Sequence, residues 1–116
     1  MALAGMGGGI IHHNIPDKQM LYMSYMPFVK NGGLFIPGHT HYQLGKELFL
    51  MLTMMGNPER IAVACKVVWI TPNGAQNNRT PGIGVQFSEV DKGQTKAKIE
   101  TYLAGALESD RPTYTL

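Results

Sequence analysis

The chain has 116 residues, of which 44% are apolar and 16% charged, with ten basic and eight acidic side chains. This length suits one domain with one hydrophobic core, and this composition excludes a disordered chain. Because the charges are interspersed, the sequence lacks the basic cluster typical of a nucleic-acid interface, and it predicts no nucleic-acid partner.

The first seventeen residues show neither the basic start nor the long apolar run of a signal peptide, and no later stretch has the length of a membrane span. Gly7-Gly8-Gly9 is followed by no helical pattern, so it does not indicate a phosphate-binding loop. The single cysteine, Cys65, cannot form an internal disulfide. We therefore interpret residues 1–17 as a flexible N-terminal arm and expect a cytoplasmic protein.

A strand-turn-strand pattern follows the arm. Residues 18–29 alternate as a strand would, with Tyr22 on the outward face, and Pro27 places this strand at an edge or a bulge. Asn31-Gly32-Gly33 predicts a tight turn, because Asn and Gly tolerate the positive φ angles that hairpin turns require. Residues 33–36 form the short return strand.

Three further strands are predicted downstream. Residues 47–54 are apolar on both faces, residues 60–70 form the longest strand, and residues 82–87 alternate strictly. Residues 71–81 are polar and rich in turn formers, so they predict a long exposed loop. The other face of the last strand carries Gly82 and Gly84, which leaves room for a bulky group.

Beyond Phe87 the hydrophobic period changes to that of a helix. Asp91 can cap the helix start, and apolar residues recur at helical spacing up to Leu107. The sequence thus predicts a mainly β domain over residues 18–108, a single small antiparallel β-barrel with one C-terminal α-helix, followed by a tail over residues 109–116.

The turn after Pro27 resembles a motif of the PilZ domain family, small β-barrels known as receptors of cyclic di-GMP. In that family the turn carries (Asp/Asn)-x-Ser-x-x-Gly followed by apolar residues. Here Phe28 stands at the acidic or amide position, Lys30 stands at the serine position, and Gly33 is retained. The turn has kept its shape-forming glycine while its two ligand-binding side chains are replaced.

A wider resemblance links the chain to the members of this family that serve type IV pilus assembly. It is carried by Tyr25–Val29, Gly32–Pro37, Val67–Trp69, Thr71-Pro72, Gly74-Ala75-Gln76, Arg79 and Gly82–Phe87. Binding of cyclic di-GMP in the family relies on an upstream Arg-x-x-x-Arg, whereas this chain has no arginine before Arg60. We therefore expect no cofactor and no cyclic di-GMP binding. The competing hypothesis is a receptor that holds the dinucleotide through Lys18 and Lys30.

In the pilus-assembly members, the resemblance implies an adaptor that docks the pilus extension ATPase, while another face meets a degenerate GGDEF and EAL-domain receptor of cyclic di-GMP. Aromatic side chains give large contact areas at low entropy cost. The proposed contact residues are Tyr22, Trp69, Pro112, Tyr114 and Leu116. The strand pattern leaves two orientations open for Trp69, which either faces solvent or is buried under the helix or against the strand glycines.

The sequence offers few candidates for catalysis or metal binding. Histidine pairs at 12–13 and at 39 and 41 invite a metal hypothesis, but no cysteine or convergent carboxylate completes a ligand set, so we interpret them as solvated. Cys65 lies on the apolar side of a strand, and we interpret it as buried filler. An enzyme built on His39, His41 and Arg79 is the second competing hypothesis, and we expect none.

Overall fold

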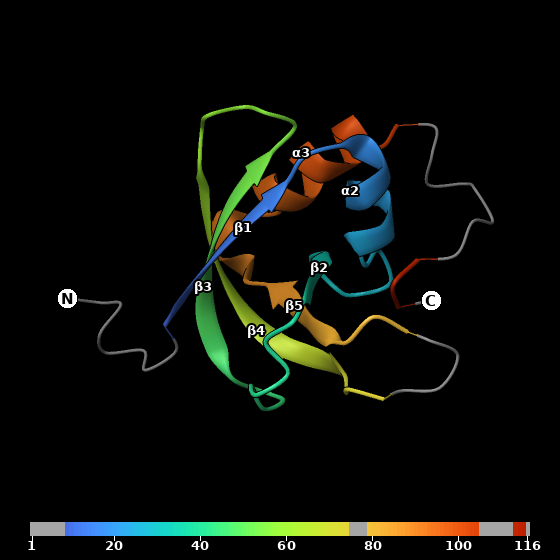
Figure 1. Cartoon of the computed structure of the whole chain (residues 1–116). Coiled ribbons are helices and arrows are strands. Elements are labelled where there is room, and N and C mark those ends of the chain that lie inside the picture. Colours follow the sequence, from blue (N-terminus) through green and yellow to red (C-terminus); the bar gives the residue numbers. More distant parts are fainter. Residues whose placement is uncertain (1–8, 75–78, 105–112, 116) are drawn as a thin grey trace.

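The computed structural model of the chain describes residues 9–74, 79–104 and 113–115. Within these ranges five strands form one curled sheet, and two α-helices lie against one side of it (Figure 1). The elements are β1 (Ile10–Ile15), α2 (Lys18–Ser24), β2 (Gly33–Pro37), β3 (Glu47–Met54), β4 (Ile61–Thr71), β5 (Gly82–Phe87), the short 3-10 helix η2 (Glu89–Asp91) and α3 (Gln94–Tyr102).

The strands follow the order β1-β3-β4-β5-β2, so β1 and β2 are the two edges of the sheet. All neighbours are antiparallel except β1 and β3, which are parallel. Helix α2 contacts both edge strands and therefore spans the open side of the curl (Figure 1). The predicted mainly β barrel with a C-terminal helix is confirmed in outline, with one parallel pair that the sequence did not indicate.

Strand β1 corrects the predicted N-terminal arm, since residues 10–15 belong to the sheet. Ile11 and Ile15 point into the core and are buried, while His12 and Asn14 on the other face are exposed. The strand pairs along its whole length with β3, and the Ile15 carbonyl accepts a hydrogen bond from the amide of Met55. Burial of two isoleucines and a full ladder of backbone pairing explain why this segment is ordered.

Helix α2 corrects the predicted strand over residues 18–29. The carboxylate of Asp17 accepts a hydrogen bond of 2.8 Å from the amide of Met20 and so caps the helix. Leu21, Tyr22 and Tyr25 then fall on one side of the helix, at helical spacing, and all three are buried. The predicted outward orientation of Tyr22 is wrong, because only 7% of its surface is exposed.

The main core lies between the helices and what we call the inner face of the sheet. Every second residue of β3 and β5, and of β4 as far as Val67, points into it, and α2 and α3 cover it from the other side. Its principal members are Leu21, Leu48, Leu50, Leu52, Val63, Cys65, Val67, Ile83, Val85, Phe87, Ile99 and Leu103.

Helix α3 confirms the predicted C-terminal helix. The Asp91 carboxylate accepts hydrogen bonds from the amides of Gly93 and Thr95 and from the Thr95 hydroxyl. Partial burial opposes ionisation of Asp91, but these hydrogen bonds outweigh it and lower its pKa.

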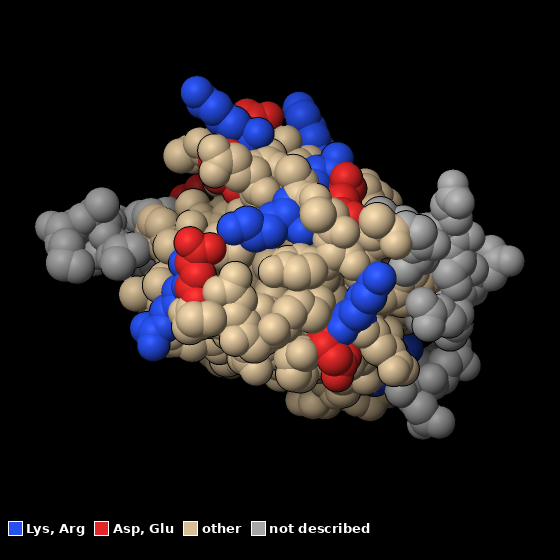
Figure 2. Space-filling model, turned by 90° about the horizontal axis from the view of Figure 1, so that it is seen from above, with Lys and Arg blue, Asp and Glu red and all other residues tan. Residues whose placement is uncertain are grey.

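Charges of both signs are interspersed on the face shown in Figure 2, as the sequence predicted. Among the described residues no helix has the length and apolar character needed to cross a membrane.

Candidate protein-interaction surface

A β-bulge in β4 moves Trp69 out of the main core. Val67 pairs with Val85, but two positions later Trp69 pairs with Gly84, so β4 holds one extra residue at this point. Gly84 lies between two core residues of β5 and therefore faces the opposite, outer side of the sheet. The bulge thus reverses the face that simple alternation gives Trp69, as bulges commonly do near functional sites.

Two glycines of β5 make the outer face concave enough to hold large side chains. A Cβ atom built on Gly84 would lie 2.7 Å from the sulfur of Met26 and 2.8 Å from the Cβ of Trp69. A Cβ atom on Gly82 would lie 2.6 Å from the ring of Phe35. The space that the sequence predicted above these glycines is therefore filled by Met26, Phe35 and Trp69. Met26 and Phe35 are fully buried.

We call the buried Met26 and Phe35, together with Trp69, the outer cluster. Trp69, its neighbour Phe28, and Tyr114, whose ring packs on Phe35, form what we call the outer aromatic patch. The rings of Phe28 and Trp69 are 6.1 Å apart and tilted by 58°, a favourable arrangement for aromatic pairs. The indole nitrogen of Trp69 donates a 2.8 Å hydrogen bond to the Thr71 hydroxyl. Phe28 keeps 48% of its surface exposed, whereas Trp69 is half-buried, between the two predicted alternatives.

The C-terminal tail supplies the third aromatic of the patch. The Tyr114 ring lies 5.1 Å from the ring of Phe35, and its amide donates to the Met23 carbonyl at 2.9 Å. The guanidinium of Arg79 donates to the carbonyls of Tyr114 and Thr115, at 3.3 and 2.8 Å. The structure therefore brings Trp69 and Tyr114 to one face, while Pro112 and Leu116 lie outside the described residues.

The predicted turn before β2 is confirmed, although it follows a helix instead of a strand. Asn31 and Gly32 have φ angles of 68° and 78°, the left-handed conformation for which Asn and Gly are suited. Of the predicted hairpin only one bridge remains, between Tyr25 and Leu34. A Cβ atom on Gly33 would lie 2.5 Å from the Val85 carbonyl oxygen, so close strand packing explains this glycine.

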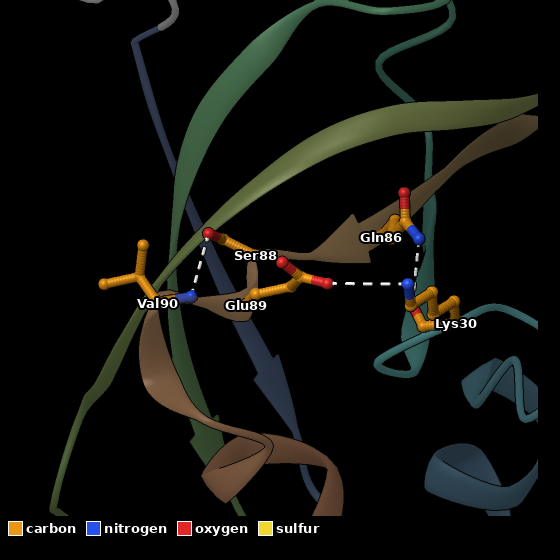
Figure 3. A network of polar contacts seen from close by, with 5 residues as sticks. All are labelled: Lys30, Gln86, Ser88, Glu89 and Val90. Atoms are coloured by element: carbon orange, nitrogen blue, oxygen red, sulfur yellow. Dashed lines mark hydrogen bonds and ion pairs between the residues drawn. The ribbon is translucent and has the colours of Figure 1, made fainter.

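Lys30, at the serine position of the family motif, is tied to β5 and η2 (Figure 3). Its carbonyl accepts a 2.9 Å hydrogen bond from the side-chain amide of Gln86. Its ammonium lies 3.6 Å from a carboxylate oxygen of Glu89, with side chains 80% and 73% exposed. An ion pair this exposed contributes only about 0–1 kcal/mol, so it holds Lys30 weakly.

Cys65 is buried, as predicted, and its thiol donates a 3.6 Å hydrogen bond to the Leu48 carbonyl. Burial raises the pKa of this thiol to about 12, so it stays protonated and unreactive near neutrality.

The guanidinium of Arg79, a candidate for catalysis in the sequence, donates to the carbonyls of Tyr114 and Thr115 described above. Its contacts therefore give it a structural part, which is to hold the tail.

The histidines do not form a metal-binding group within the described residues, where no cluster of three or more His, Cys, Asp or Glu side chains could hold an ion. His39 and His41 are exposed in the loop before β3, as predicted, and the His41 ring lies 4.5 Å from that of Tyr42. The predicted solvated position is wrong for His13, which is half-buried because it lies on the same face of β1 as Ile11 and Ile15. Burial, and secondarily the nearby His39, lowers its pKa.

Sequence reasoning missed Phe28 as a member of the surface, because it treated this position only as a degraded ligand motif. A signal was present, since an aromatic residue between Pro27 and Lys30 is unexpected in a solvated turn. The part played by Met26 and Phe35 in supporting Trp69 depends on the bulge, which has no recognisable sequence pattern.

A family model described as PilZ domain matches residues 10–105. The matched region begins at β1 and contains all five strands and both α-helices of the described structure. No curated protein matches the chain.

Proposed function

The chain belongs to the PilZ domain family, and from this membership we propose that it is a non-enzymatic adaptor whose outer aromatic patch binds a protein partner. More specifically, we propose that the partner is the type IV pilus extension ATPase and that the complex forms in the cytoplasm. The sequence resemblance to pilus-assembly members of the family supports this assignment.

One observation carries the proposal. Phe28 stands where the family motif places a carboxylate or amide, and its ring packs against Trp69 with nearly half of its surface open to solvent. A position that is polar in the family motif thus belongs to an aromatic pair that is partly exposed. Exposed aromatics supported by a rigid, buried layer are typical centres of protein interfaces.

The same region gives little support for cyclic di-GMP binding. No arginine precedes Arg60 to fork onto phosphates and stack on guanine. Isothermal calorimetry with cyclic di-GMP is therefore expected to show no heat of binding. Micromolar binding that is lost in Lys30→Gln, with the fold intact, would replace the adaptor proposal by that of an atypical receptor.

The burial of Tyr22 changes the set of contact residues that the sequence proposed. Tyr22 is almost wholly inside the main core, so its aromatic ring supports α2 and is replaced in the proposal by Phe28. Pro112 and Leu116, on either side of the described tail segment, remain proposed contacts.

A second partner belongs to the proposal, namely a degenerate GGDEF and EAL-domain receptor of cyclic di-GMP that binds another surface. The adaptor would then link a second-messenger sensor to the motor. It can favour the assembly-competent state of the ATPase only if it binds that state more tightly than the others.

Capture of the purified extension ATPase tests the first partner. Trp69→Ala and Phe28→Ala should each weaken binding by roughly tenfold or more, as for the central aromatics of other interfaces. Leu44→Ala is the control, because Leu44 is 65% exposed in the loop before β3 and lies outside the patch. Circular dichroism should show the same fold in all three variants.

Two results would contradict the proposal. If the wild-type chain does not capture the ATPase at micromolar concentrations, the assigned partner is wrong. If folded Trp69→Ala and Phe28→Ala variants bind as tightly as the control, the ATPase binds a different surface.

A further inference from the structure

A hollow of about 690 Å³ lies between the turn before β2 and the start of α3. The turn forms one wall, with Pro27, Phe28 and Val29 supplying its apolar part. The other wall comes from η2 and the first turn of α3. The charged residues lining it are Lys30, Lys92, Lys96 and Glu89.

The charges around this hollow are unbalanced, with three lysines and one glutamate. Lys30 pairs weakly with Glu89 at 3.6 Å, and Lys96 lies 4.0 Å from Glu100 on the next turn of α3. Within the described residues Lys92 makes no ion pair with a carboxylate. Three of the four charged residues that line the hollow are basic, and this local excess favours an acidic ligand.

The helix terminus itself does not explain such a site. The amides of Gly93 and Thr95, which could otherwise bind an anion, already donate to the Asp91 carboxylate. The lysine ammonium groups would therefore have to supply the attraction. Ammonium groups bind carboxylates as flexible point charges, without the bidentate geometry that arginine gives to phosphate.

The hollow is continuous with the outer aromatic patch, because Phe28 belongs to both. Its ring packs against Trp69 and also lines the hollow. A partner seated on the patch would thus bring its neighbouring residues over the lysines. The most suitable occupant is a protein segment with carboxylates beside apolar residues.

We propose that this hollow binds an acidic segment of the protein partner, and that a partner carboxylate takes the place of Glu89 beside Lys30. The proposal rests on the adaptor function above and adds the chemistry of the partner's contact segment. Replacement of Glu89 is physically accessible, because the existing ion pair is exposed and long (Figure 3).

A second hollow, of about 750 Å³, provides space for a longer segment. It lies over the outer face of β3 and β4, where Phe49, Ala62 and Ala64 form an apolar floor. Both hollows are lined by Lys30 and Glu89, so the ion pair lies where they meet.

A titration followed by amide NMR tests the inference with model peptides in place of the partner. The probe is a synthetic peptide that repeats Glu-Glu-Leu, and the control peptide repeats Gln-Gln-Leu. We expect the acidic peptide to shift the amides of Asn31, Gly32 and Gly93, with an affinity that falls as salt is added. The amide peptide should bind roughly tenfold more weakly.

Two substitutions with opposite expected effects on the affinity for the acidic peptide sharpen the test. Lys92→Gln should weaken binding of the acidic peptide severalfold, whereas Glu89→Gln should strengthen it, because it removes the competing carboxylate from Lys30. Lys18→Gln is the matched control, since Lys18 is exposed at the start of α2 and does not line the hollow. Its affinity should equal that of the wild type.

Several outcomes would overturn the inference. These are shifts at other residues only, equal binding of the two peptides, no shifts at millimolar peptide, or weaker binding by Glu89→Gln. Saturation of the same amides by a single-stranded oligonucleotide at lower concentration would assign the hollow to nucleic acid instead. Failure of ATPase capture with a positive peptide titration would reject the assigned partner and leave the acidic site standing.

Discussion

The two faces of the sheet are closed by different means. On the inner face, aliphatic side chains of β3, β4 and β5 are covered completely by α2 and α3. On the outer face of β5, Gly82 and Gly84 leave a depression that Met26, Phe35 and Trp69 fill, and the Tyr114 ring packs on Phe35. The inner closure uses regular elements, whereas the outer closure uses a turn, a bulge and a tail.

This difference separates stability from recognition. The inner core excludes water and carries most of the apolar burial, so its residues should determine the free energy of unfolding. The outer cluster is also buried at its base, but its upper layer leaves Phe28 about half exposed. Phe28 can therefore be changed at a smaller cost to the fold than a fully buried residue of the inner core.

The largest effect is expected for a truncation in the inner core. Leu50 is fully buried and lies between β1 and β4, so Leu50→Ala should lower the free energy of unfolding by about 2–5 kcal/mol. Urea denaturation measures this loss. Leu44→Ala makes the same substitution at an exposed site, and an equal loss there would erase the distinction between core and surface.

The next largest effect tests the depression on the outer face. Gly84→Ala places a Cβ atom against Met26 and Trp69 and should cost about 1–3 kcal/mol of stability. Trp69 is the only tryptophan, so its fluorescence should shift to longer wavelength as the ring is displaced. Unchanged stability and emission would show that the outer cluster can expand freely.

The sequence predicted the elements whose pattern is long and regular. Alternation identified β4 and β5, a continuous apolar run identified β3, and helical spacing identified α3, because each pattern is long enough to be distinctive. Helix α2 was missed because it has only seven residues, in which alternating and helical spacing overlap. Asp17, which caps it, was the available signal.

Other features depend on contacts between distant parts of the chain. Strand β1 is ordered by a parallel partner more than thirty residues away, a relation that no local pattern specifies. The orientation of Trp69 depends on a bulge that shifts the register by one residue. Of the candidate surface, Trp69 and Tyr114 were therefore identified as residues, but their common location was not.

The dependence of stability on pH tests the burial of Cys65 on the inner face of the sheet. Burial raises the pKa of Cys65 from an ordinary value of 9.0 to about 12. Above pH 9 the unfolded chain releases this proton while the folded chain retains it, so stability should fall by about 1 kcal/mol per pH unit up to pH 12. Its contribution is fully present below pH 9.

The control for this titration must separate Cys65 from Tyr25. Burial, a hydrogen bond to Glu100 and the charge of Glu100 also raise the pKa of Tyr25, which therefore adds a loss of the same sign at higher pH. Cys65→Val should flatten the stability profile between pH 9 and 10, whereas Tyr25→Phe should flatten it only above that range. An unchanged profile in Cys65→Val would contradict the burial of the thiol.

The smallest effect on global stability concerns Arg79, which holds the tail over the outer face. Arg79→Gln removes donors to the carbonyls of Tyr114 and Thr115, and it should cost about 1 kcal/mol, the usual net worth of a hydrogen bond. Hydrogen exchange at the Tyr114 amide should accelerate more than exchange in β4, because the tail would open locally. Arg60→Gln, at an exposed site before β4, is the control. Equal protection of Tyr114 in both variants would mean that ring packing on Phe35 alone places the third aromatic of the patch.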